Sequence, residues 1–116
     1  MAVLVYVENW NGSFKKASFE AVSYASQFAK KLGTCTIALT IANKDNPEIL
    51  GKYGASKVIT ISDSSMEYFS NQAYANALCK VADKEEADII IVSNTNNGKS
   101  LSPIIAAKRN SSLNTN

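Results

Sequence analysis

AVLVYV, residues 2–7, opens the chain with an unbroken apolar run that is rich in valine. A strand with one face in water alternates apolar and polar residues, whereas a strand covered on both faces is apolar throughout. The run is too short to span a membrane, and it lacks the basic start and small-residue cleavage site of a signal peptide. It therefore predicts a strand buried in the middle of a parallel sheet.

Three further β-branched or apolar runs predict strands, each buried on both faces, at residues 34–41, 57–61 and 87–92. Apolar residues at helical spacing predict helices in the intervals, and polar turns separate the elements. The predicted helices cover residues 14–32, ending at Gly33; 47–53, between Asn46 and Gly54; 68–85; and a last one in which Leu101, Ile104, Ile105 and Lys108 share a side and Pro103 lies in the first turn.

The element order β-α-β-α-β-α-β-α predicts an α/β fold: a doubly wound parallel sheet, Rossmann-like, with helices on both faces in three layers. No strand follows the last helix, because residues 110–116 show no pattern. No repeat or linker divides the chain, so residues 1–116 are expected to form a single domain that is incomplete at its C-terminal end.

Composition excludes several classes of function. A net charge of +2, with Lys15-Lys16 and Lys30-Lys31 at opposite ends of one predicted helix, argues against nucleic-acid binding. No run is long enough for a membrane span. The chain has no histidine, and its two cysteines, Cys35 and Cys79, are expected to be small buried hydrophobic residues. We therefore predict no metal site and no catalytic residue.

The polar loop at residues 93–99 is the most suggestive local feature, because it follows a strand and precedes a helix. Gly98-Lys99-Ser100 resembles the end of a phosphate-binding P-loop, and these three residues are weak candidates for cofactor binding. Ser93 stands where that motif requires its first glycine. An ordinary helix entry is the alternative interpretation.

Two acids and one tryptophan are expected at the carboxyl edge of the sheet. Glu8 follows the first strand and Asp63 the third, as in a receiver-type phospho-acceptor pocket, although single acids in loops are common. Trp10 is either an exposed contact residue or a cover for the sheet edge. The loop around it, residues 9–12, lacks the G-x-G-x-x-G turn of dinucleotide-binding proteins.

Several segments, in order along the chain, resemble the N-terminal domain of the electron transfer flavoprotein alpha subunit. They are residues 3–8 (VLVYVE), 12–18 (GSFKKAS), 50–58 (LGKYGASKV), 87–92 (ADIIIV) and 98–103 (GKSLSP). The sequence departs from the family pattern at Ile104, where an arginine is common, and at Arg109, where an apolar residue is usual. The resemblance implies strand order 3-2-1-4 with the fifth strand missing.

The resemblance also implies a function. In this family a heterodimer carries electrons from acyl-CoA and other dehydrogenases, through FAD, to the respiratory chain, as in fatty acid beta-oxidation. This chain would be a scaffold that contacts the beta subunit. It would be an electron carrier subunit and not an enzyme, located in a bacterial cytoplasm. FAD would be held mainly by an absent C-terminal domain, so none is expected in this chain. The alternative is an adenine-nucleotide-binding domain of the universal-stress type.

Overall fold

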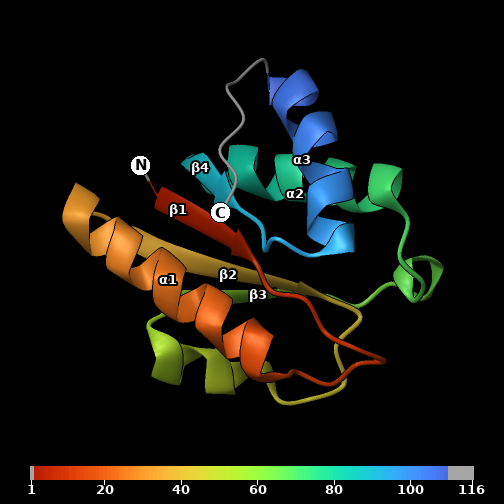
Figure 1. Ribbon diagram of the computed structural model, residues 1–116, viewed down its shortest axis with the longest axis horizontal. Coiled ribbons are helices and arrows are strands. Elements are labelled where there is room, and N and C mark those ends of the chain that lie inside the picture. The colour runs from red at the N-terminus through yellow and green to blue at the C-terminus, as the bar shows by residue number, and fades with distance from the viewer. Residues whose placement is uncertain (1, 110–116) are drawn as a thin grey trace.

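The computed structural model describes residues 2–109 and shows a four-stranded parallel sheet between two helical layers (Figure 1). The strands are β1 (Ala2–Tyr6), β2 (Cys35–Ile41), β3 (Lys57–Ile61) and β4 (Ala87–Ile91). They are ordered β3-β2-β1-β4, and every neighbouring pair is parallel. The predicted fold class and strand order are confirmed. The predicted lack of pattern at residues 110–116 lies outside the described residues.

The helices form one layer on each face of the sheet (Figure 1). Helix α1 (Lys16–Leu32) and the 3₁₀ helix η1 (Pro47–Tyr53) cover one face. Helices α2 (Asn71–Lys84) and α3 (Asn96–Arg109) cover the other, and a short 3₁₀ turn, η2 (Ser64–Met66), precedes α2. None of the described helices has the length and apolar character needed to cross a membrane.

Capping residues decide where these helices begin and end. Gly33 and Gly54 adopt the left-handed conformation at the ends of α1 and η1, as predicted. The prediction that the helix over residues 68–85 begins at residue 68 is wrong. Ser70 caps α2, and Tyr68 lies outside the helix with 82% of its surface exposed. The first helix likewise begins at Lys16 and not at residue 14.

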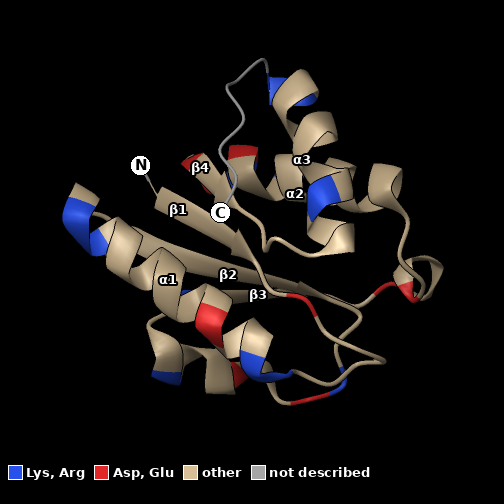
Figure 2. Ribbon diagram, in the orientation of Figure 1, with Lys and Arg blue, Asp and Glu red and all other residues tan. Residues whose placement is uncertain are grey.

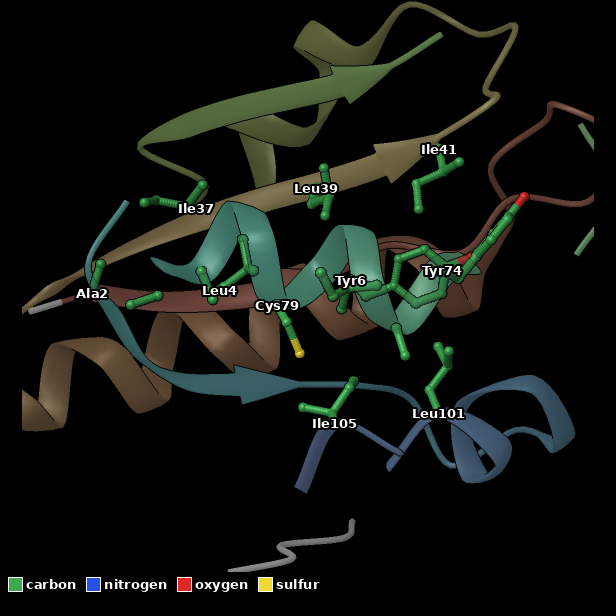
Figure 3. Packing of buried hydrophobic residues seen from close by; sticks show 14 residues of the cluster. Ala2, Leu4, Tyr6, Ile37, Leu39, Ile41, Tyr74, Cys79, Leu101 and Ile105 are labelled. Carbon is green, nitrogen blue, oxygen red and sulfur yellow. The ribbon is translucent and has the colours of Figure 1, made fainter. Parts of the chain in front are cut away.

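The side chains of β1 supply the centre of two apolar clusters, one on each face of the sheet. Leu4 and Tyr6 point toward α2 and α3, as Figure 3 shows, whereas Val3 and Val5 pack against α1. All five residues of β1 are buried, which confirms the prediction from residues 2–7. The prediction of burial on both faces is wrong for the two outer strands, β3 and β4. Their apolar residues are mostly half-buried.

The two cysteines differ in environment. Cys79 is buried in the cluster between α2 and the sheet, as predicted. The prediction is wrong for Cys35, which is exposed because it is the first residue of β2 and lies where the strand leaves the core. Both are free thiols, and burial raises the pKa of the Cys79 thiol.

Tyr6 makes the fold sensitive to alkali. Its ring packs edge-to-face on Tyr74, with centroids 6.1 Å apart, and burial raises the pKa of its phenol, with Tyr74 and Glu8 raising it further. The unfolded chain releases this proton near pH 10, whereas the folded chain retains it, so stability must fall as pH rises above about 10. We expect Tyr6→Phe to reduce this loss in urea titrations at successive pH values. Tyr68→Phe, at an exposed position, should reproduce the wild-type slope.

Candidate functional site

The carboxyl ends of β1 and β4 form the place where a doubly wound sheet normally binds a ligand. These strands are neighbours, and the chain leaves them toward opposite faces of the sheet: α1 follows β1, and α3 follows β4. The divergence opens a crevice in most proteins of this class. Glu8, in the loop after β1, and Thr95, in the loop after β4, both lie at this edge.

Glu8 and Thr95 join the two loops through hydrogen bonds. The Thr95 hydroxyl donates to Glu8 Oε1 at 2.5 Å, and it accepts the backbone N–H of Gly98 at 3.0 Å. Glu8 is buried with 5% of its surface exposed, and its backbone carbonyl accepts the Ser18 hydroxyl. A carboxylate near the first turn of a helix is favoured by the helix dipole. The protein's own carboxylate thus lies where an anionic ligand would bind.

Helix α3 begins earlier than the sequence predicts. Residues 96–99 belong to its first turn and not to a loop, because Thr95 caps the helix through the Gly98 N–H. The prediction that Pro103 lies in the first turn is therefore wrong, since it lies inside the helix. Thr95 was not predicted as a functional residue, although a threonine between a strand and the following helical segment is a candidate N-cap.

The three candidate phosphate-binding residues do not form a cradle. The Gly98 N–H donates to Thr95 Oγ1, and the Lys99 N–H donates to the Thr95 carbonyl at 2.8 Å. The Ser100 hydroxyl donates to the Asn97 carbonyl at 2.7 Å. Lys99 is exposed. The geometry favours the alternative interpretation, an ordinary capped helix entry.

Gly98 allows the first turn of α3 to lie directly against the backbone of Ser93, in the loop after β4. A Cβ atom at this position would lie 1.9 Å from the Ser93 carbonyl oxygen, which is part of the backbone. Gly98 was a candidate for phosphate binding from the sequence. Its observed role is close contact between the helix and the loop that precedes it.

The loop after β1 is a tight hairpin. Trp10 and Ser13 exchange backbone hydrogen bonds of 2.8 and 3.1 Å around Asn11 and Gly12, which both have positive φ. The Gly12 carbonyl accepts the Lys44 N–H at 2.7 Å, so the hairpin is also tied to the loop after β2. Trp10 is half-buried with the Lys15 ammonium 5.0 Å from its ring centroid, which favours a covering role.

Asp63 does not join Glu8 in an acidic pocket. It is exposed and caps η2 by accepting the N–H and hydroxyl of Ser65, and these hydrogen bonds lower the pKa of its carboxyl. Strand β2 lies between β3 and β1, which separates the ends of those strands by ~10 Å. The receiver-type hypothesis is therefore wrong.

Residues 2–109 thus define a doubly wound α/β domain in which a hydrogen bond between Thr95 and Glu8 bridges the carboxyl ends of β1 and β4. The sequence profile described as the electron transfer flavoprotein domain matches residues 3–116. The chain therefore belongs to the electron transfer flavoprotein domain family.

Curated relatives carry electron-transfer names. The chain is 28% identical to the acryloyl-CoA reductase electron transfer subunit beta of Anaerotignum propionicum, over 96% of this chain and 31% of that protein. It is 29% identical to the electron transfer flavoprotein subunit alpha of Clostridium acetobutylicum, over 96% and 34%. It is 30% identical to subunit LctC of the lactate dehydrogenase (NAD+, ferredoxin) of Acetobacterium woodii, over 96% and 27%. The chain spans about one third of the length of these relatives.

Among solved structures, a universal stress protein from Archaeoglobus fulgidus is similar, with a TM-score of 0.64 and 14% identity. The match covers 99% of this chain and 92% of that chain. At this identity the likeness shows a shared fold.

Lys99→Ala tests whether the α3 entry binds nucleotide. We expect the midpoint of thermal unfolding to stay almost unchanged, because substitutions of exposed side chains shift stability by about 0.5 kcal/mol or less. Calorimetric titration with ATP should give the same negligible heat for wild type and variant. A measurable ATP affinity that disappears in Lys99→Ala would instead favour the universal-stress alternative.

Proposed function

We propose that this chain is the scaffold and subunit-contact domain of an electron transfer flavoprotein. The observation that carries the proposal is the family match across residues 3–116, in a chain whose β1 and β4 loops are joined by the Glu8–Thr95 hydrogen bond. Such a domain serves by binding and orientation, while the electron chemistry belongs to the cofactor. The curated relatives are named as electron transfer subunits, and this chain is accordingly proposed to be a non-catalytic carrier subunit.

The described residues lack the Rossmann-type site for a dinucleotide. That site uses backbone N–H groups at a glycine-rich turn after the first strand. Here that turn is a hairpin in which the Gly12 N–H donates to the Asn9 side chain at 3.0 Å. The first turn of α3 is likewise capped by Thr95. We therefore propose that FAD is bound elsewhere in the complete flavoprotein, in its C-terminal domain.

The proposed partner is the beta subunit of the flavoprotein. Through the whole complex, the domain would serve acyl-CoA dehydrogenases and other dehydrogenases that feed the respiratory chain. We propose a cytoplasmic location in a bacterium, and neither nucleic acid nor membrane as a partner.

A chimera tests the scaffold role. This chain would replace the matching N-terminal third of the Clostridium acetobutylicum alpha subunit, and the chimera would be co-expressed with the beta subunit of the same organism. We expect a heterodimer that retains flavin absorbance through gel filtration. The chain purified alone should be colourless after incubation with FAD.

Two results would count against the proposal. One is a chimera whose N-terminal domain resists proteolysis, and is therefore folded, but which assembles no flavin-containing heterodimer. The other is persistent flavin absorbance of the purified chain alone. A chimera carrying Gly98→Val should fail by misfolding, and it supplies the control for loss of structure.

A further inference from the structure

The chain contains two Asn-Gly pairs, Asn11-Gly12 and Asn97-Gly98. Such a pair can modify itself, because the glycine backbone nitrogen can attack Cγ of the asparagine and no side chain on the glycine hinders the approach. A bond forms between the glycine nitrogen and Cγ, the bond from Cγ to Nδ2 breaks, and ammonia leaves with the proton of the glycine N–H. Water then opens the five-membered imide and gives aspartate or isoaspartate. Asparagine is accordingly among the thermolabile residues of proteins.

Both asparagines lie at the surface, whereas the glycines that follow them are buried. Asn11 is exposed in the hairpin after β1, and Asn97 is exposed in the first turn of α3. Gly12 and Gly98 are both buried. In each pair the attacking nitrogen therefore belongs to packed backbone, and water can reach the asparagine that it would attack.

In both pairs the glycine N–H is held by a side-chain oxygen three residues earlier in the chain. The Gly12 N–H donates to Asn9 Oδ1 at 3.0 Å. The Gly98 N–H donates to Thr95 Oγ1, also at 3.0 Å. The imide ring closes only after the backbone rotates about the Cα–C bond of the asparagine, and this rotation turns the glycine N–H away from its acceptor. The hydrogen bond must therefore break before the nitrogen can attack.

Each acceptor oxygen is itself held in place by a second hydrogen bond. Asn9 Nδ2 donates to the carbonyl of Ile41, the last residue of β2, at 2.7 Å. The Thr95 hydroxyl donates to the buried carboxylate of Glu8. The restraint on each glycine N–H is thus anchored to a distant part of the fold and not to a flexible side chain alone.

The surroundings of Asn97 give its modification a structural consequence. Helix α3 carries basic residues and no acidic residue, as its blue segments in Figure 2 show, so deamidation would place the first carboxylate on this helix. Aspartate suits the first turn of a helix because the helix dipole favours a negative charge there. Isoaspartate adds a methylene group to the backbone beside Gly98, where even a Cβ atom would lie 1.9 Å from the Ser93 carbonyl oxygen.

We propose that Asn11 and Asn97 are sites of spontaneous deamidation, and that Asn9 and Thr95 are positioning residues that suppress it. Each positioning residue acts by holding the N–H of the glycine that follows its asparagine. The modification consumes water and releases ammonia, and it replaces a neutral amide by a carboxylate.

Two variants of the purified chain test the proposal, Asn9→Ala and Thr95→Val. Folded samples are incubated at mildly alkaline pH and digested, and mass spectrometry of the separated peptides gives the rate of deamidation at each site. We expect Asn9→Ala to speed the reaction at Asn11 and Thr95→Val to speed it at Asn97. Each increase should be about threefold or more, the effect of losing one hydrogen bond.

The two sites are controls for each other. General loss of stability would speed deamidation at both, whereas loss of a local acceptor speeds it only at the adjacent site. Thr95→Ser keeps the acceptor oxygen and should retain the slow wild-type rate at Asn97. The wild-type chain unfolded in urea gives the unrestrained rate, which should exceed the folded rate at both sites.

Three outcomes overturn the proposal. They are equal rates in folded and unfolded wild-type chain, variants that react no faster than wild type at the adjacent site, and equal acceleration of both sites in either variant. A Thr95→Ser chain that reacts at Asn97 as fast as Thr95→Val would also overturn it, because the acceptor oxygen would then have no influence.

Discussion

Gly98→Ala is expected to destabilise the domain by about 3 kcal/mol. The added Cβ would lie 1.9 Å from the Ser93 carbonyl oxygen and 3.0 Å from its carbonyl carbon. Backbone atoms cannot rotate away as the end of a flexible side chain can. The first turn of α3 would therefore have to move away from Ser93, which also strains the Thr95 cap.

Gly51→Ala is the matched control for this prediction. No atom lies within 4 Å of a Cβ built at Gly51, so the free energy of unfolding should change by about 0.5 kcal/mol or less. Urea unfolding followed by far-UV circular dichroism measures both variants. Similar midpoints for Gly98→Ala and wild type would show that α3 is not packed against Ser93 as described.

Thr95→Val is expected to cost about 2–4 kcal/mol, because one hydroxyl serves two buried groups. Its loss leaves the Glu8 carboxylate without its hydroxyl donor and the Gly98 N–H without its acceptor. A helix cap contributes about 0.5–2 kcal/mol, and a hydrogen bond to a charged group about 1.5–3 kcal/mol. Valine has nearly the same shape as threonine, so the loss reports on the hydroxyl and not on packing.

Thr95→Ser separates this explanation from a general effect of substitution. Serine keeps the hydroxyl, and its variant should recover most of the lost stability in the same unfolding measurement. A double-mutant cycle with Glu8→Gln measures the coupling between the two side chains. Additive effects of Thr95→Val and Glu8→Gln would contradict a direct Thr95–Glu8 interaction.

The sequence predicted the elements whose signal is local. The apolar run at residues 2–7 predicts a central strand because only a strand covered on both faces can lack polar residues. Gly33 and Gly54 mark helix ends because each accepts a backbone conformation that other residues resist. The order of strands and helices leaves few topologies, so the parallel sheet could also be predicted.

Tertiary structure decided the roles of residues that meet across the fold. Glu8 and Thr95 are 87 positions apart in the chain, and nothing local to either one indicates a hydrogen bond. Gly98 belongs to a sequence that resembles a phosphate loop, but its close contact with the Ser93 carbonyl depends on the backbone path of residues 93–98, in which Thr95 caps α3. The local sequence determines backbone preference and the pattern of buried side chains. Which distant side chains become neighbours depends on the order of the strands in the whole sheet. The carboxyl edge could therefore be located from the sequence, and its closure by Glu8 could not.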